Sequence, residues 1–125
     1  MSGAWLERRV CRVDDIENPG AREFQSGEGD WPFSGIVCRI GESVVAYANV
    51  CPHKGHPLNL IDDHFLISMP GGGRLLRCAS HGALFVPETG LCVVGPCSGR
   101  SLTPLACRID DGAVLVRAPA SRTAL

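Results

Sequence analysis

Short runs rich in apolar residues recur along the chain, some of them alternating with polar residues, and glycine, proline or acidic residues end most of them. Side chains alternate between the two faces of a β-strand, so this pattern predicts strands. The clearest runs are residues 5–13, 33–40, 43–50, 74–77, 84–86, 91–94, 105–109 and 113–117. Weaker runs predict a short strand at 65–68 and leave room for another near 22–25. We therefore expect an all-β protein of about nine short antiparallel strands.

Three of the predicted connections have the residues of β-hairpin turns. Gly41-Glu42 is a two-residue turn with glycine first, Pro87-Glu88-Thr89-Gly90 separates two short apolar runs, and Asp110-Asp111-Gly112 separates the last two. The 15 glycines and 9 prolines, with few aromatic residues, also favour turns and short strands over long helices. The sequence thus predicts neighbouring strands that pair as hairpins.

Three predicted strands contain a similar four-residue piece. The pieces are Val10-Cys11-Arg12-Val13, Val37-Cys38-Arg39-Ile40 and Ala106-Cys107-Arg108-Ile109. In a strand, the cysteine and the final Val or Ile share one face and the arginine lies on the other. We expect Cys11, Cys38 and Cys107 to face a core as small apolar side chains.

Length, charge and cysteine content narrow the class of protein. A chain of 125 residues suits one domain, and a net charge of −1 gives neither a nucleic-acid footprint nor a polybasic membrane patch. The opening MSGAWLERRV lacks the apolar stretch of a signal peptide, and no run approaches the ~18 apolar residues of a membrane span. A cytoplasmic protein is expected, in which the seven cysteines serve as ligands or buried thiols rather than disulfides.

Two stretches combine a thiol and an imidazole in a tight turn. Cys51 and His53 are two positions apart, Cys78 and His81 are three apart, and glycine follows each pair. This is the outline of a four-ligand metal site made by two opposed loops. Zinc also accepts two cysteines and two histidines, but its common spacings keep like ligands together, so the mixed order favours an iron–sulfur cluster.

The two stretches resemble the Rieske [2Fe–2S] motif, C-x-H followed by C-x-x-H. The resemblance spans roughly residues 44–116 and includes the Thr89-Gly90 turn and the Gly95-Pro96-Cys97 segment. It implies that Cys51 and Cys78 hold one iron and that His53 and His81 hold the other. It further implies one Rieske domain over residues 1–125, with stacked antiparallel sheets and a cluster-binding subdomain, about residues 46–95, inserted into a basal β domain.

The resemblance also assigns residues around the cluster. Gly55 and Gly82 would let backbone amides approach the sulfides, and Pro96 would belong to a loop that covers the cluster. We expect His56 to line the rim rather than to act as a ligand.

Three positions of the resemblance bear on the reduction potential. High-potential relatives carry a disulfide between the two loops, where this chain has His56 and Ser80, and a serine donor where this chain has Ala83. Without that disulfide and that donor, the reduced state is less stabilised, so we expect the low-potential end of the Rieske range.

The resemblance implies an electron carrier that passes electrons from a reductase to a terminal oxygenase through transient contacts, as a monomer or small homo-oligomer, without nucleic acid or membrane. A Rieske oxygenase needs a further large domain with a mononuclear iron, for which this chain has no length, so catalysis by the chain alone is not expected. Two alternatives remain: a small subunit of a complex such as nitrite reductase, and a redox sensor that uses Cys92 or Cys97. Inert buried thiols are the simpler interpretation of those two cysteines.

Overall fold

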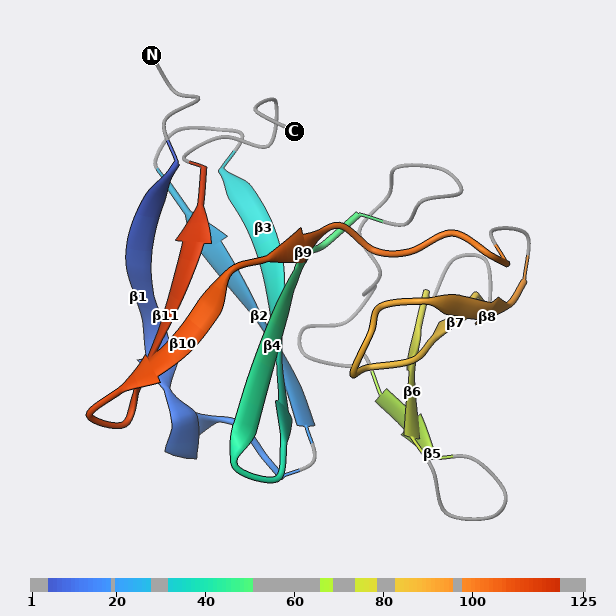
Figure 1. Cartoon of the computed structure of the whole chain (residues 1–125), viewed down its shortest axis with the longest axis horizontal. Coiled ribbons are helices and arrows are strands. Elements are labelled where there is room, and N and C mark those ends of the chain that lie inside the picture. Colours follow the sequence, from blue (N-terminus) through green and yellow to red (C-terminus); the bar gives the residue numbers. More distant parts are fainter. Residues whose placement is uncertain are drawn as a thin grey trace.

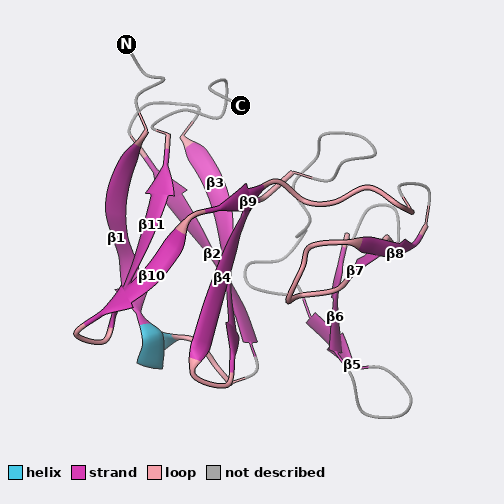
Figure 2. Ribbon diagram, viewed as in Figure 1, coloured by secondary structure: helices cyan, strands magenta, loops and turns pink. Residues whose placement is uncertain are grey.

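The chain forms three antiparallel β-sheets in a computed structural model that describes residues 5–18, 20–27, 32–50, 66–68, 74–78, 83–95 and 98–119. Within these residues there are eleven strands and one short 3₁₀ helix, η1 (Val13–Asp15) (Figures 1 and 2). The strands are β1 (Leu6–Arg12), β2 (Gly20–Ser26), β3 (Phe33–Ile40), β4 (Ser43–Ala48), β5 (Leu66–Ser68), β6 (Arg74–Arg77), β7 (Leu84–Phe85), β8 (Cys92–Val94), β9 (Pro104–Leu105), β10 (Cys107–Asp110) and β11 (Ala113–Ala118). The expected all-β class is confirmed.

The three sheets are stacked in layers (Figure 1). The basal sheet has the order β1-β11-β10, the central sheet β2-β3-β4-β9, and the distal sheet β5-β6-β7-β8. The central sheet separates two cores, because side chains on each of its two faces are buried against another sheet. Stacked antiparallel sheets, which the resemblance implied, are therefore confirmed.

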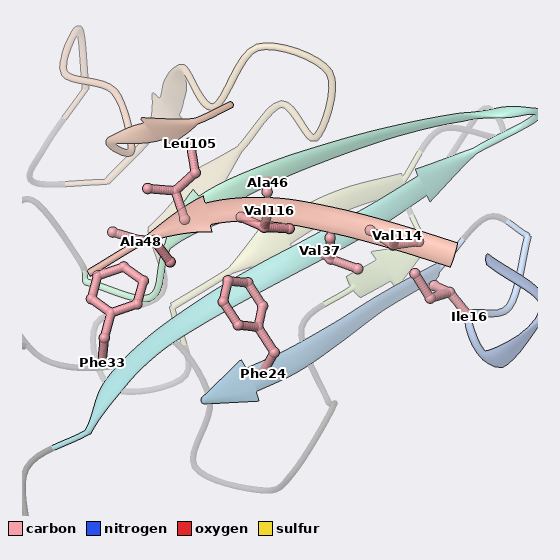
Figure 3. Packing of buried hydrophobic residues seen from close by; sticks show 10 residues of the cluster. Ile16, Phe24, Phe33, Val37, Ala46, Ala48, Leu105, Val114 and Val116 are labelled. Atoms are coloured by element: carbon pink, nitrogen blue, oxygen red, sulfur yellow. The ribbon is translucent and has the colours of Figure 1, made fainter. Parts of the chain in front are cut away.

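The basal core lies between the basal and central sheets (Figure 3). Phe24 and Phe33 of the central sheet pack there with their ring centroids 6.4 Å apart. Val114 and Val116 of β11, both fully buried, cover them from the basal sheet. Full burial of such aliphatic and aromatic side chains contributes about 1.5–3 kcal/mol each, so this core holds the two sheets together.

The distal core lies between the central and distal sheets. Ile36 and Cys38 of β3 meet Leu76 and Phe85 of the distal sheet, and all four side chains are fully buried. Since Val37 points into the basal core, successive residues of β3 serve different cores. This explains why residues 33–38 are buried without interruption, whereas a strand with one exposed face alternates.

Tyr47 of β4 ties the central sheet to the β7–β8 turn. Its hydroxyl donates a hydrogen bond to the Pro87 carbonyl at 2.8 Å within the buried interface. Gly90 has a φ of +76°, and a Cβ placed there would lie 2.8 Å from the Tyr47 ring. Glycine at the end of this turn therefore allows both the left-handed backbone and the close approach of the ring.

Most predicted strands and all three predicted hairpins are present. β3 and β4 pair around Gly41-Glu42, β7 and β8 around residues 86–91, and β10 and β11 around Asp111-Gly112, both of which have positive φ. The region near 22–25, where the sequence left room for a short strand, is the seven-residue β2. No sequence pattern had indicated η1.

The predicted strand at 105–109 is instead two strands in different sheets. Pro104–Leu105 pairs with β4 in the central sheet, and Cys107–Asp110 pairs with β11 in the basal sheet. The exposed Ala106 lies at the crossing, where its carbonyl accepts a hydrogen bond from the Arg117 amide at 2.9 Å. An alternating pattern cannot show that the hydrogen-bonding partner changes within the run.

The three Cys-Arg pieces behave largely as expected. Cys38 is buried in the distal core, while Cys11 and Cys107 are half-buried against the basal core. Ile109 shares the face of Cys107, since the two pair with Val114 and Val116, but it is 38% exposed because β10 is an edge strand. Arg39 lies on the face opposite Cys38, as expected, and there its largely covered guanidinium donates to the carbonyls of Val13 and Ile16 at 3.2 Å, which fastens η1 to β3.

In the part of the chain that the structure describes, no helix has the length and apolar character that crossing a membrane requires.

The contact between Gly35 and Phe24 provides a test of the basal core. A Cβ on Gly35 would overlap the Phe24 ring, so Gly35→Ala should lower the free energy of unfolding by about 1–3 kcal/mol, the usual cost of overpacking. Urea denaturation followed by fluorescence measures the loss. In a Phe24→Leu background the smaller side chain should relieve the overlap, and the same substitution should then cost clearly less. Equal losses in the two backgrounds would contradict this packing.

Candidate metal centre

Of the four expected ligands, Cys78 lies within the described residues. Cys51, His53 and His81 lie outside them, as do the residues expected around the cluster, which are Gly55, His56, Ser80, Gly82 and Pro96. The structure therefore gives the strand ends from which both loops start, and the surroundings of one thiol.

The first loop starts where β4 leaves the central sheet. The Ala48 amide donates to the Thr103 carbonyl at 2.9 Å, and the Asn49 amide donates to the Ser34 carbonyl at 3.0 Å. The chain is thus held on both sides up to Asn49, two residues before Cys51. These bonds fix the point from which the first ligand loop departs.

The second loop is the end of the β6–β7 hairpin. Arg77 pairs with Leu84, and the next hydrogen bond runs from the Cys78 amide to the Ala83 carbonyl at 2.9 Å. Only four residues, 79–82, remain between these two positions, and His81 is one of them. The ladder therefore confines His81 to a short connection that starts at Cys78.

The side chain of Cys78 is fully buried in the distal core, as is Ala83 on the other side of the loop. A Cys78 thiolate in this position would bind a metal from the side of the metal that faces the protein core. Alanine has no hydroxyl group, so the nearby Ala83 cannot donate a side-chain hydrogen bond to that site.

Gly95 lies against the end of the second loop, a contact that sequence reasoning did not assign. Its φ is +108°, and a Cβ there would lie 2.9 Å from the Ala83 Cα. The Ser98 hydroxyl donates to the Gly95 carbonyl at 2.8 Å and closes the following turn. The glycine before Pro96 in the sequence was the available signal, because glycine permits this positive φ and this close approach of the backbone.

Three cysteines outside the expected ligand set are shielded from reaction. Burial, with smaller contributions from the neighbouring Cys107 and Glu88, raises the pKa of Cys38 to about 12. Burial likewise raises the pKa of Cys107 to about 11 and raises that of Cys11. A thiol with a raised pKa carries little of the thiolate that binds metals or attacks disulfides, so these residues act as packing groups.

Cys92 of β8 is 2% exposed, and its thiol donates a weak hydrogen bond to the Val94 carbonyl at 3.3 Å. This burial agrees with an inert thiol and gives no support to the sensor alternative. Cys97, the other cysteine considered for that role, lies outside the described residues. Among the described residues, no group of three or more His, Cys, Asp and Glu side chains is arranged to hold a metal ion.

A family model described as "Rieske [2Fe-2S] domain" matches residues 7–114. The chain belongs to this family. Its cofactor is accordingly a [2Fe–2S] cluster. None of the curated proteins compared with the chain matches it.

Solved structures of Rieske proteins share the fold. The ferredoxin of carbazole 1,9a-dioxygenase from Nocardioides aromaticivorans IC177 superposes with a TM-score of 0.67 at 22% identity, covering 89% of this chain and 96% of that one. A Sphingomonas yanoikuyae B1 ferredoxin gives 0.66 at 20% identity, with 91% and 100% covered. A Mycobacterium tuberculosis protein described as an NADH-dependent nitrite reductase small subunit gives 0.63 at 20% identity, with 92% and 96% covered.

The residues of this chain fit the cluster. Two thiols and two imidazoles are the terminal ligands that a Rieske centre uses, and the chain has one of each in both stretches. Cys78 lies at a strand end with its amide fixed and its side chain buried, as an inner cysteine ligand requires. The full set of Cys51, His53, Cys78 and His81 remains a prediction.

The raised thiol pKa values predict a loss of stability at alkaline pH. Burial raises the pKa of the Cys38 thiol from 9.0 to about 12, so above pH 9 the unfolded state loses its proton first. The free energy of unfolding should be unaffected by this group below pH 9 and should fall between pH 9 and 12, by on the order of a few kcal/mol. Urea denaturation across this range measures the slope.

Two variants separate this titration from simple packing. Cys38→Ala should lower stability at neutral pH but make the decline above pH 9 less steep, because one of the titrating groups is gone. Val37→Ala, a neighbouring truncation in the same strand, should lower stability equally at every pH. An undiminished alkaline slope in Cys38→Ala would count against the assignment.

Proposed function

We propose that the protein is a one-electron carrier whose [2Fe–2S] cluster is held by Cys51 and Cys78 on the inner iron and by His53 and His81 on the outer iron. When bound, the cluster supplies a single reversible electron. Family membership supports the cofactor, and the observation that carries the ligand assignment is the buried Cys78 at the mouth of a four-residue loop containing His81.

The residues of the chain do three things in this role. The distal core keeps water away from the Cys78 side of the site, since Leu76, Cys78, Ala83 and Phe85 are all fully buried. The β6–β7 ladder fixes the second loop, and the central sheet fixes the start of the first. We propose that the cluster-binding subdomain, about residues 46–95, is inserted in the remaining chain as a part of one Rieske domain.

We infer that the partners are a reductase as donor and an oxygenase-type enzyme as acceptor, met in transient contacts in the cytoplasm. A similar fold is found in a protein named as the ferredoxin of carbazole 1,9a-dioxygenase, which supports this class of partner. The alternative is a small subunit of a larger oxidoreductase, and the similarity to a nitrite reductase small subunit supports it. Weak redox encounters usually bury less than about 1,200 Å², whereas permanent subunits bury more.

Spectroscopy and metal analysis test the cofactor and its ligands. Anaerobically purified protein should contain two irons per chain and, after reduction by dithionite, give a Rieske EPR signal with an average g below that of all-cysteine clusters. His81→Cys or His53→Cys should lower the midpoint potential toward the all-cysteine range, near about −400 mV, if a cluster is retained. The reason is charge, because a thiolate replaces a neutral imidazole.

His64→Cys is the matched control for the ligand variants, since it adds a thiol outside the expected ligand set. It should leave the midpoint potential of wild type unchanged. A colourless protein with stoichiometric zinc would overturn the proposal. An unchanged midpoint in both ligand variants would reject the two histidines as ligands.

Purification from the native cells distinguishes carrier from subunit. A transient carrier should elute from size exclusion as a monomer or small oligomer, and salt should not change that. A subunit should co-elute with a large partner in constant ratio through successive columns. Stable co-elution of this kind would favour the subunit alternative and contradict the carrier.

A further inference from the structure

The distal sheet lies at one end of the stack of sheets, so only one of its faces can pack against the central sheet (Figure 1). Leu76, Phe85 and Cys92 are buried on that inner face, in the distal core. Their neighbours along each strand therefore lie on the opposite face, which we call the outer distal face. Its apolar side chains are Leu75, Leu84, Val86, Leu91, Val93 and Val94, the last of which pairs with Leu84 after a shift in register.

Much of this apolar surface is open to solvent. Leu91, Val93 and Val94 are 40%, 44% and 49% exposed, and the other apolar side chains of the outer distal face are half-buried. Among the described residues, the other exposed large apolar side chains are Leu6 and Ile109, both on the basal sheet. Single exposed apolar residues are ordinary, whereas a contiguous group marks an interaction site. The outer distal face has the second character.

One positive charge lies within this apolar surface. Arg77 pairs with Leu84 and so belongs to the same face, where it is the only charged side chain among the described residues. It is exposed and makes no hydrogen bond or ion pair with the part of the chain that the structure describes. Glu88, in the β7–β8 turn, instead lines a groove beside Tyr47, on the side of the central sheet. A molecule that covers this face must therefore bring a carboxylate to Arg77.

The outer distal face extends to the second ligand loop. Arg77 and Leu84 form the last pair of the β6–β7 ladder. The next residues along the two strands, Cys78 and Ala83, form the hydrogen bond at the mouth of the four-residue connection. A protein bound to this face would therefore lie beside the loop whose sequence contains His81.

Shape and charge select another protein as the occupant. Small molecules bind in concave pockets that enclose them, and the outer face of a sheet offers no such enclosure. In a symmetric dimer the same surface would face itself. Among its described residues this surface has no carboxylate, so two copies of Arg77 would be buried without partners, which is costly.

We propose that the outer distal face is the docking surface for the electron-transfer partner, a protein that presents an apolar patch with an Asp or Glu carboxylate opposite Arg77. The proposal rests on the function proposed above, which requires brief contact with a second protein. A small apolar patch with one charge suits a weak redox encounter better than a permanent interface, which is larger and more hydrophobic. Because one cluster serves both donor and acceptor, the donor is sufficient as the probe.

Steady-state reduction by the donor reductase tests the apolar part of the surface. The reductase is purified from the native cells by its NAD(P)H-dependent reduction of the wild-type holoprotein. The double variant Val93→Ser/Val94→Ser should raise the KM of the reductase for this protein about tenfold, because two apolar side chains no longer contribute to the contact. The kcat, the midpoint potential and the rate of reduction by dithionite should stay at their wild-type values.

Leu6→Ser/Ile109→Ser is the matched control. It removes two exposed apolar side chains from the basal sheet, on the other side of the central sheet (Figure 1), and should leave the KM unchanged.

The charge is tested in the same assay. Arg77→Gln should raise the KM about threefold at low salt, the effect of one exposed ion pair, and should reduce the dependence of the KM on ionic strength. Arg9→Gln removes an exposed arginine of β1 and is the control, with wild-type KM and salt dependence expected.

Three outcomes would overturn the proposal. The first is a wild-type KM in Val93→Ser/Val94→Ser, and the second is an equal rise in the basal-sheet control. The third is a wild-type dimer in sedimentation equilibrium that Val93→Ser/Val94→Ser dissociates, since the face would then belong to a second copy. If the double variant does not fold, Leu91→Ser decides by the same criteria. Failure of the proposed function differs from all three, because the wild type itself would then lack a Rieske spectrum or accept no electron from a reductase.

Discussion

The structure depends on burial of the central sheet on both faces. Residues of β3 alternate between the basal core, which receives Phe33 and Val37, and the distal core, which receives Ile36 and Cys38. A central sheet with one solvent-exposed face could pack against only one of the other two sheets. Two-sided burial instead fixes all three layers against each other. The hydrogen bond from Tyr47 to Pro87 adds a directional tie between the central sheet and the distal sheet.

This constraint explains which parts of the fold could be predicted from the sequence. The hairpins at Gly41-Glu42 and Asp111-Gly112 follow from local turn chemistry, so short-range pattern was sufficient. The split between β9 and β10 was missed because alternation continues through Ala106 while the pairing partner changes. Likewise, alternation placed Cys38 on a core face but could not show that Cys11 faces a different core.

For the site, the motif predicts the ligand set but little of the structure that supports it. The three-residue spacing of Cys78 and His81 predicts a tight turn. The β6–β7 ladder, which leaves four residues for the connection, is consistent with that prediction. The hydrogen bonds that join the side chains of Glu23, Ser34 and Asn49 had no such signal, because these residues are 11 and 15 positions apart and meet only through strand pairing. Serine, glutamate and asparagine on strands more often face solvent, so the residue types alone do not indicate that these three side chains are covered.

The two loops are held by different means, and topology gives the reason. The second loop closes a hairpin, so the hydrogen bonds of β6 and β7 fix both of its ends. The first loop leaves the central sheet after β4, and the next strand of the chain, β5, belongs to the distal sheet. No ladder of the described strands therefore joins its two ends, and before it the chain is held by the backbone hydrogen bonds of the Ala48, Asn49 and Val50 amides. The hydrogen bond from the Asn49 side-chain amide to the Ser34 hydroxyl adds a further tie to β3 at this point.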